Sequence, residues 1–276
     1  MKEWPKHPVI YEINTWVWLH ELSGRLQRRV TLQNVPDEDW DAIAALKVDA
    51  VWLMGVWERS PAAARIAREL PSLEAEYRRA LPDCSPLDVV GSPYAIHRYV
   101  TDQHLGGPAG LAAARAALAQ RGVRLILDFV PNHVAMDHPW ARTHPELMIC
   151  GRPEDLEHKP DYFFATGDRV LAHGKDPYFP PWTDTAQLNA FHPGLRRAAI
   201  SLLESLAAQC DGVRCDMAML VMNSVFESNW GYRAGARPVE DFWTEIVPTE
   251  PTLAPEIEQF SLSARQQSTT PSEITP

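Results

Sequence analysis

The chain has 276 residues, 45% of them apolar, which is enough for one large domain or two small ones. The net charge of -10 comes from acidic and basic residues mixed along the chain, without the basic stripe that marks nucleic-acid binding. No apolar run approaches the roughly 18 residues of a membrane span, and the start lacks the apolar stretch of a secretory signal. The cysteines form no CxxC pair and no metal-ligand cluster, so we expect reduced thiols in a cytoplasmic protein. They are Cys84, Cys150, Cys210 and Cys215.

Strand-like and helix-like segments alternate along the chain. β-branched and aromatic residues, or short apolar runs, predict strands at 9–19, 49–57, 123–130 and 212–217. Helical spacing of apolar residues predicts helices at 36–46, 108–120, 194–209 and 240–247. This alternation predicts a parallel sheet with helices outside it.

Two long excursions, 58–102 and 134–191, each follow a predicted strand. Long loops in a compact domain are usually functional. If the sheet belongs to a barrel, loops that follow strands lie on its catalytic face. We therefore expect both excursions there.

A first pair of candidate residues lies on the predicted strand 212–217. Side chains alternate across a strand, so Arg214 and Asp216 should point to the same face. A nearby arginine favours the charged form of a carboxylate and orients it, as a carboxylate nucleophile requires. A structural ion pair at a strand end would give the same pattern.

A second set ends the preceding predicted strand, in the sequence DFVPNH. Asp128 closes an apolar run, a costly place for a charge without a partner. His133 could donate a hydrogen bond to a sugar hydroxyl, and Asn132 offers an oxygen that suits calcium. A capped strand end with a surface histidine is the alternative.

Two further segments carry less information by themselves. Tyr94, in GSPYAIHRY, follows a Gly/Pro turn and could present its ring as a stacking platform, although ordinary loop packing would give the same pattern and is favoured for this segment alone. The segment DTAQLN (184–189) precedes the predicted helix 194–209.

In this order, the four segments resemble the short motifs of glycoside hydrolase family 13, the α-amylase family. The resemblance covers about residues 5–248 and implies a TIM (β/α)8 barrel in which an inserted B domain follows the third strand. It implies that Asp216 is the catalytic nucleophile, that Arg214 orients it, and that His133 and Tyr94 contact the sugar ring. Asp128 would be a structural carboxylate beside the substrate.

The implied chemistry is retaining cleavage or transfer of an α-glycoside through a covalent glycosyl-enzyme. An α-linked oligosaccharide or glucan would be the partner. The resemblance implies no required cofactor, with calcium at Asn132 as an option. Aromatic residues of the second excursion would line further sugar subsites or pack the insertion itself, namely Trp140, Tyr162, Phe163, Tyr178 and Trp182.

The family pattern also divides the chain. Residues 1–133 would form the first part of the barrel with strands one to three, residues 134–190 the inserted loop-rich B-like domain, and residues 191–248 the continuation with strand four. Residues 249–276, rich in Pro, Ser and Thr, predict a disordered tail. The fold class is thus α/β, the N-terminal half of a TIM barrel.

The family's general acid is a glutamate at the end of the fifth strand, which we do not find. Glu256 and Glu258 lie in roughly the right stretch, but in a poor strand. A complete barrel needs about 250 residues without large insertions, so we expect a truncated or frame-shifted member with poor turnover. A non-catalytic remnant that binds sugar is the alternative. A nucleotide-binding protein would need a glycine-rich loop after the first strand, which is missing.

Overall fold

The computed structural model describes residues 4–247. The predicted tail, together with Glu256 and Glu258, lies outside the described residues.

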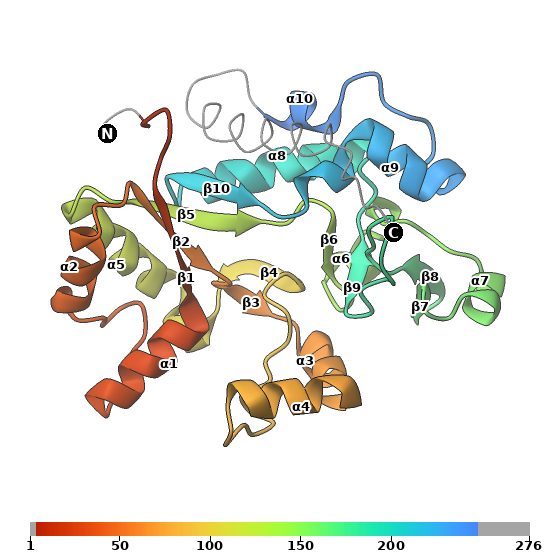
Figure 1. The fold of residues 1–276 in the computed structure, drawn as a ribbon. Coiled ribbons are helices and arrows are strands. Elements are labelled where there is room, and N and C mark those ends of the chain that lie inside the picture. Colours follow the sequence, from red (N-terminus) through yellow and green to blue (C-terminus); the bar gives the residue numbers. More distant parts are fainter. Residues whose placement is uncertain (1–3, 248–276) are drawn as a thin grey trace, which may run out of the picture.

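Four parallel strands form the central sheet, in the order β1–β2–β5–β10 (Figure 1). They are β1 (Ile10–Asn14), β2 (Ala50–Met54), β5 (Arg124–Phe129) and β10 (Gly212–Cys215). The helices between them are α1 (Thr15–Leu26), α2 (Asp37–Ala45), α5 (Gly107–Gln120) and α8 (Pro193–Ala207). This confirms the predicted fold class, half of a (β/α)8 barrel, and within the described residues the sheet does not close.

One predicted strand, 9–19, is wrong in its second half. The strand stops at Asn14 and helix α1 starts at Thr15, although TWVWL is rich in residues that favour strands. Asn14 begins the helix because its side chain accepts a hydrogen bond from the backbone N–H of Val17 at 3.4 Å. The other three predicted strands and the four predicted helices occur, with ends shifted by a few residues.

The first excursion begins and ends with an antiparallel pair that is separate from the central sheet, β3 (Trp57–Arg59) and β4 (Ile96–Thr101). Between these strands, α3 (Pro61–Glu69) and α4 (Pro71–Ala80) project from the body of the molecule (Figure 1). A short 3₁₀ helix, η1 (Gln103–Leu105), then leads into α5.

The second excursion contains two antiparallel pairs, β6 with β9 and β7 with β8. Its elements are β6 (His133–Ala135), α6 (Trp140–Thr143), η2 (Pro145–Leu147), α7 (Pro153–His158), β7 (Phe163–Thr166), β8 (Arg169–Ala172) and β9 (Thr185–Gln187). Beyond β10 follow η3 (Ala218–Val221), α9 (Asn223–Trp230), η4 (Gly231–Ala234) and α10 (Phe242–Ile246). No helix of the described segment has the length and apolar character to cross a membrane.

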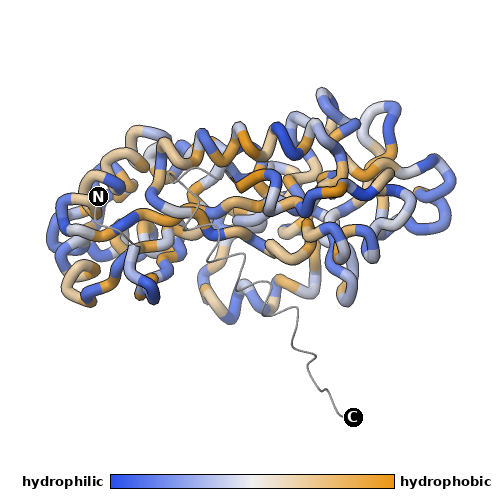
Figure 2. Tube along the Cα trace, turned by 90° about the horizontal axis from the view of Figure 1, so that it is seen from above, coloured by the Kyte–Doolittle hydropathy of each residue, from blue (hydrophilic) through white to orange (hydrophobic). Residues whose placement is uncertain are grey.

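The core lies between the sheet and its helices. Val51, Leu53, Leu125 and Leu127 are fully buried on the helix-covered face. Figure 2 shows hydrophobic residues running along the middle of the molecule and many hydrophilic residues toward both ends. On the opposite face Trp52 is half-buried, and Arg214 keeps 28% of its side chain exposed, whereas Asp128 is fully buried.

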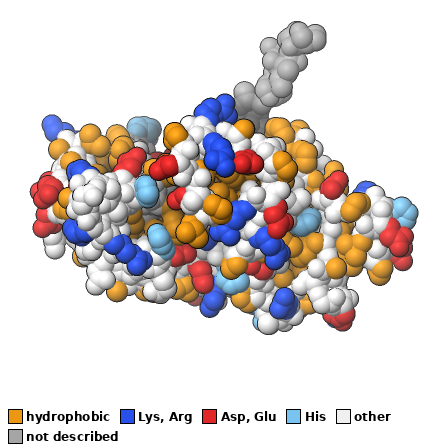
Figure 3. Space-filling view, turned by 90° about the horizontal axis from the view of Figure 1, so that it is seen from below, with side chains coloured by type: hydrophobic (Ala, Val, Ile, Leu, Met, Phe, Trp, Pro, Cys, Tyr) orange, Lys and Arg blue, Asp and Glu red, His pale blue; other side chains and the backbone are white. Residues whose placement is uncertain are grey.

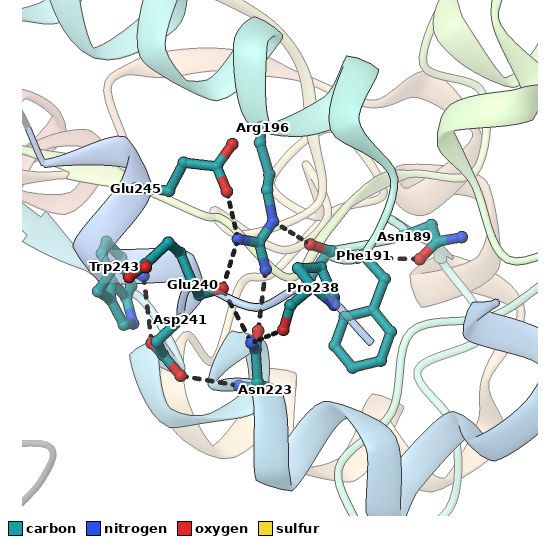
Figure 4. A network of polar contacts seen from close by, with 10 residues as sticks. Asn189, Phe191, Arg196, Asn223, Pro238, Glu240, Asp241, Trp243 and Glu245 are labelled. Atoms are coloured by element: carbon teal, nitrogen blue, oxygen red, sulfur yellow. Dashed lines mark hydrogen bonds and ion pairs between the residues drawn. The ribbon is translucent and has the colours of Figure 1, made fainter. Parts of the chain in front are cut away.

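Arg196 of α8 anchors the segment that follows β10 (Figure 4). The side chain is 1% exposed and donates to the carbonyls of Ala190 and Glu240, at 2.8 and 2.9 Å. It also donates to Asn223 Oδ1 at 2.8 Å and to Glu245 Oε2 at 2.6 Å. The start of α9 and α10 are thus fixed to α8 by one buried cation.

Candidate active site

The register of the parallel sheet brings Asp128 and Arg214 together. The two residues are direct partners on β5 and β10, so their side chains share the face opposite the covering helices. Asp216 follows one residue after β10, and its backbone N–H donates to the carbonyl of Phe129 at 2.8 Å. The chain then turns sharply at Met217, whose φ is +48°. The ends of both strands therefore converge on one point.

Arg214 and Asp216 make the contact that strand alternation predicts. Arg214 Nη1 lies 2.5 Å from Asp216 Oδ1 and 3.8 Å from Asp128 Oδ1. The guanidinium lies over the rings of Trp52 and Tyr94, with centroids at 4.9 and 5.1 Å. Burial lowers the pKa of Arg214, but Asp216, Tyr94 and Asp128 outweigh that effect and raise it overall. The cation is fixed in place by two carboxylates and two rings.

Asp128 is completely buried and has a partner for each oxygen. Oδ1 accepts from Trp52 Nε1 at 3.2 Å, and Oδ2 accepts from the backbone N–H of Gly55 at 3.0 Å. Gly55 adopts a φ of +77°, which favours glycine. Burial raises the pKa of Asp128 to about 6, although Gly55, Arg214 and Trp52 act in the opposite direction. Its charge therefore depends on pH in the physiological range.

His133 lies near Asp216 on β6, at the start of the second excursion. Burial lowers the pKa of His133 to about 4, even though the charge of Asp216 acts to raise it. The imidazole is thus neutral at neutral pH and can donate one hydrogen bond and accept another. The ring of Trp182 lies 5.0 Å from it, tilted by 53°.

The surroundings of Asn132 fit a calcium ion poorly. Gln187 Nε2 donates to Asn132 Oδ1 at 3.0 Å and to its carbonyl at 2.8 Å. Asn132 Nδ2 contacts the His133 ring at 3.3 Å. The side chains that contact Asn132 are thus a neutral amide and an imidazole ring, whereas calcium sites are built from several oxygen ligands that include carboxylates. Within residues 4–247 no group of three or more His, Cys, Asp or Glu side chains could hold a metal ion. Calcium at Asn132 stays a prediction.

Tyr94 reaches the site from the first excursion. Its loop begins at Gly91, with φ +84°, where an added Cβ would lie 2.9 Å from the backbone nitrogen of Ala64. The carbonyl of Gly91 accepts from Arg59 Nη1 at 3.0 Å, which ties the loop to β3. Burial raises the pKa of Tyr94 to about 12, so the hydroxyl stays protonated. The ring is half-buried and presents a surface beside Arg214.

Four residues of the site were missed by sequence reasoning, namely Trp52, Gly55, Arg59 and Gln187. Trp52 is a direct neighbour of Ile126 on β5, two residues before Asp128, so its place on the polar face follows from register alone. Register cannot be read before the strand order is known. Gln187 was part of the quoted DTAQLN segment, but its contact with Asn132 required the β6–β9 pairing.

The aromatics of the second excursion divide between packing and exposure. Trp182 contacts His133, whereas Phe163 is 4% exposed and packs under Arg233 at 4.8 Å. Trp140 packs on the His138 ring. Tyr178 is 87% exposed. Tyr162, 40% exposed, lies beside Lys159. Of these five aromatic residues, Trp182 is the one whose ring contacts a predicted substrate-binding residue, His133.

Comparison with known proteins points to one family. Residues 37–229 match the family model of the α-amylase catalytic domain. The α-amylase MalA of Haloarcula japonica is 24% identical over 235 residues, which are 83% of this chain and 28% of that protein.

Two solved structures show the same fold. An α-amylase from Lactobacillus plantarum is 20% identical and superposes with a TM-score of 0.52, over 94% of this chain and 43% of that one. A debranching enzyme from Nostoc punctiforme is 17% identical with a TM-score of 0.50, over 83% of this chain and 45% of that one. The chain thus spans less than half the length of these relatives. The family model covers more than half of the chain, and the chain therefore belongs to the α-amylase family of glycoside hydrolases.

Proposed function

We propose that this chain carries the nucleophile side of a retaining α-glycosidase or α-glucan-processing site, with Asp216 as the nucleophile. The observation that supports this most directly is the 2.5 Å contact between Arg214 and Asp216 at the end of β10, beside Tyr94 and His133. A purely structural ion pair would require neither the aromatic ring of Tyr94 nor the neutral imidazole of His133 on the same face. A bound sugar ring could stack on the first and form a hydrogen bond with the second.

The proposed chemistry assigns a task to each side chain. Because Arg214 holds Oδ1 of Asp216, we assign the attack on the anomeric carbon to Oδ2. The bond from that carbon to the leaving oxygen breaks as the Oδ2–carbon bond forms, through an oxocarbenium-like transition state. Tyr94 would stack on the ring and neutral His133 would donate to a hydroxyl. The negative charge around Arg214 favours the cationic transition state.

A second carboxyl group, about 5–5.5 Å from the first, must protonate the leaving oxygen in this chemistry. Asp128 is not assigned this task, because both of its oxygens accept bonds and its side chain is fully buried. Within residues 4–247, Asp128 and Asp216 are the carboxylates that pair with Arg214, and we assign the role of the acid to neither. We therefore expect slow turnover of substrates whose leaving group needs an acid.

The proposed substrates are α-linked oligosaccharides or glucans, supported by relatives that are named as α-amylases and a debranching enzyme. The proposed chemistry runs without a cofactor. A reducing, cytoplasmic location is part of the proposal, supported by four cysteines that are all free thiols.

The test uses 5-fluoro-α-D-glucosyl fluoride, because fluoride leaves without protonation and the ring fluorine slows hydrolysis of the intermediate. Mass spectrometry should find one glycosyl group, on the peptide that contains Asp216. Asp216→Asn should abolish labelling. The control Asp211→Asn removes a carboxylate that directly precedes β10 and should leave labelling unchanged. Labelling of another residue would refute the assignment. So would the absence of any labelling in a chain that still binds maltose.

A further inference from the structure

An apolar cavity lies beside the site, between the α3–α4 pair and the second excursion. Its volume is about 570 Å³, within the range of small-molecule sites. Aliphatic side chains form most of the wall, among them Ile66, Leu70, Leu73, Leu81, Val89 and Val90. Figure 3 views the molecule from below, the side from which α3 and α4 project, and shows hydrophobic side chains exposed between charged ones.

The wall chemistry limits what the cavity can hold. A glucan chain would bring many hydroxyl groups, and burying a hydroxyl without a hydrogen bond is costly. The charged residues of the wall are two carboxylates, Asp88 and Asp184, and none of its described residues is Lys, Arg or His. An anionic occupant would be repelled. An apolar group that is neutral or cationic fits.

Side chains of the cavity wall contact the residues that we assign to the sugar ring. Trp182 lines the cavity and also contacts His133, with ring centroids 5.0 Å apart. On the other side, Gly91 and Ser92 line it, and Ser92 Oγ accepts from the backbone N–H of Tyr94 at 3.1 Å. A sugar ring bound against His133 would therefore lie close to Trp182 and, through Trp182, close to the cavity.

We propose that this cavity binds an apolar, uncharged group carried by an α-glycoside, so that the chain binds α-glycosides with an apolar aglycone more tightly than the same sugar without one. This rests on the proposed function, since the glycosyl ring is placed at Tyr94 and His133. The apolar group would displace water from the aliphatic wall, and each buried methylene strengthens binding roughly fourfold.

Binding can be measured without turnover. Hexyl α-D-glucoside should bind the full chain at least tenfold more tightly than methyl α-D-glucoside in calorimetry. Ala67→Trp fills the cavity from α3 and should remove this difference. Ala75→Trp, an exposed position on α4 outside the wall, is the matched control and should keep it. Equal affinity for the two glucosides would overturn the proposal.

Thiol alkylation gives an independent reading, because Cys84 lines the cavity whereas the exposed Cys150 does not. Hexyl glucoside, and not methyl glucoside, should slow alkylation of Cys84 and leave Cys150 unchanged. Tyr94→Ala separates the two hypotheses. If this variant binds both glucosides more weakly, but the hexyl and methyl glucosides bind with equal affinity, the sugar site stands and the cavity proposal fails. If Cys84 is protected and Tyr94→Ala has no effect, the sugar is bound elsewhere and the proposed function fails.

Discussion

Asp128→Asn is expected to change the pH dependence of stability. Asp128 has a pKa of about 6 in the folded chain, against 3.8 ordinarily, because burial disfavours its charge. A carboxyl group whose folded pKa is raised stabilises the fold fully below pH 3.8, and this contribution is lost as pH rises through 6. The difference between these two pKa values corresponds to about 3 kcal/mol. Asparagine does not titrate, so this dependence disappears.

Urea unfolding, followed by tryptophan fluorescence from pH 4.5 to 7.5, measures the effect. The stability of the natural chain minus that of Asp128→Asn should fall by about 2 kcal/mol over this window, since part of the titration lies below pH 4.5. A constant offset is expected in addition, because the amide nitrogen of asparagine cannot accept a hydrogen bond, so the N–H of either Trp52 or Gly55 loses its acceptor. Asp168→Asn, with a side chain 92% exposed, controls for lost surface charge. A difference that is independent of pH would refute the reasoning.

Three further predictions concern residues around the site. His133→Gln should show the opposite trend. Because the pKa of His133 is about 4 in the folded chain and 6.5 ordinarily, this residue stabilises the fold above pH 6.5, and the contribution is lost as pH falls. Between pH 7 and 4.5 the natural chain should therefore lose about 2 kcal/mol of unfolding free energy relative to the variant in the same assay. Arg196→Met should cost about 3 kcal/mol of unfolding free energy because buried acceptors lose their donor, while exposed Arg197→Met should cost under about 0.5 kcal/mol. Removing calcium with EGTA should leave the melting temperature unchanged, since Asn132 already accepts from Gln187; a drop of several degrees would show a calcium site.

Local patterns predicted the sheet well because buried parallel strands are short, apolar and separated by long helices. They failed at Asn14, where one side-chain hydrogen bond starts a helix inside a sequence that favours strands. The capping signal is a single residue, and in the sequence-based prediction the strand propensity of TWVWL outweighed it. Such boundaries are set by one contact and not by a pattern.

The site was predicted in part for a similar reason. Arg214 and Asp216 lie two residues apart, so strand geometry alone placed them together. Asp128 and Tyr94 came from other strands and loops, and their approach to Arg214 depends on strand order and on the Gly91 turn. Trp52, which covers the guanidinium, carries no signal that distinguishes it from a core tryptophan. What sequence reasoning missed is the contact made by register.

The charges around Arg214 lead to a last prediction, the pH dependence of covalent labelling by the glucosyl fluoride. With Asp128 protonated, Asp128, Arg214 and Asp216 sum to zero charge when Asp216 is ionised. With Asp128 ionised, above about pH 6, the cluster carries one net negative charge next to the anomeric carbon. That charge stabilises an oxocarbenium-like transition state, so labelling should accelerate as pH rises from 5 to 7. In Asp128→Asn the acceleration centred near pH 6 should be lost. If it persists unchanged in that variant, another group controls the rate and Asp128 serves only to hold Trp52 and Gly55.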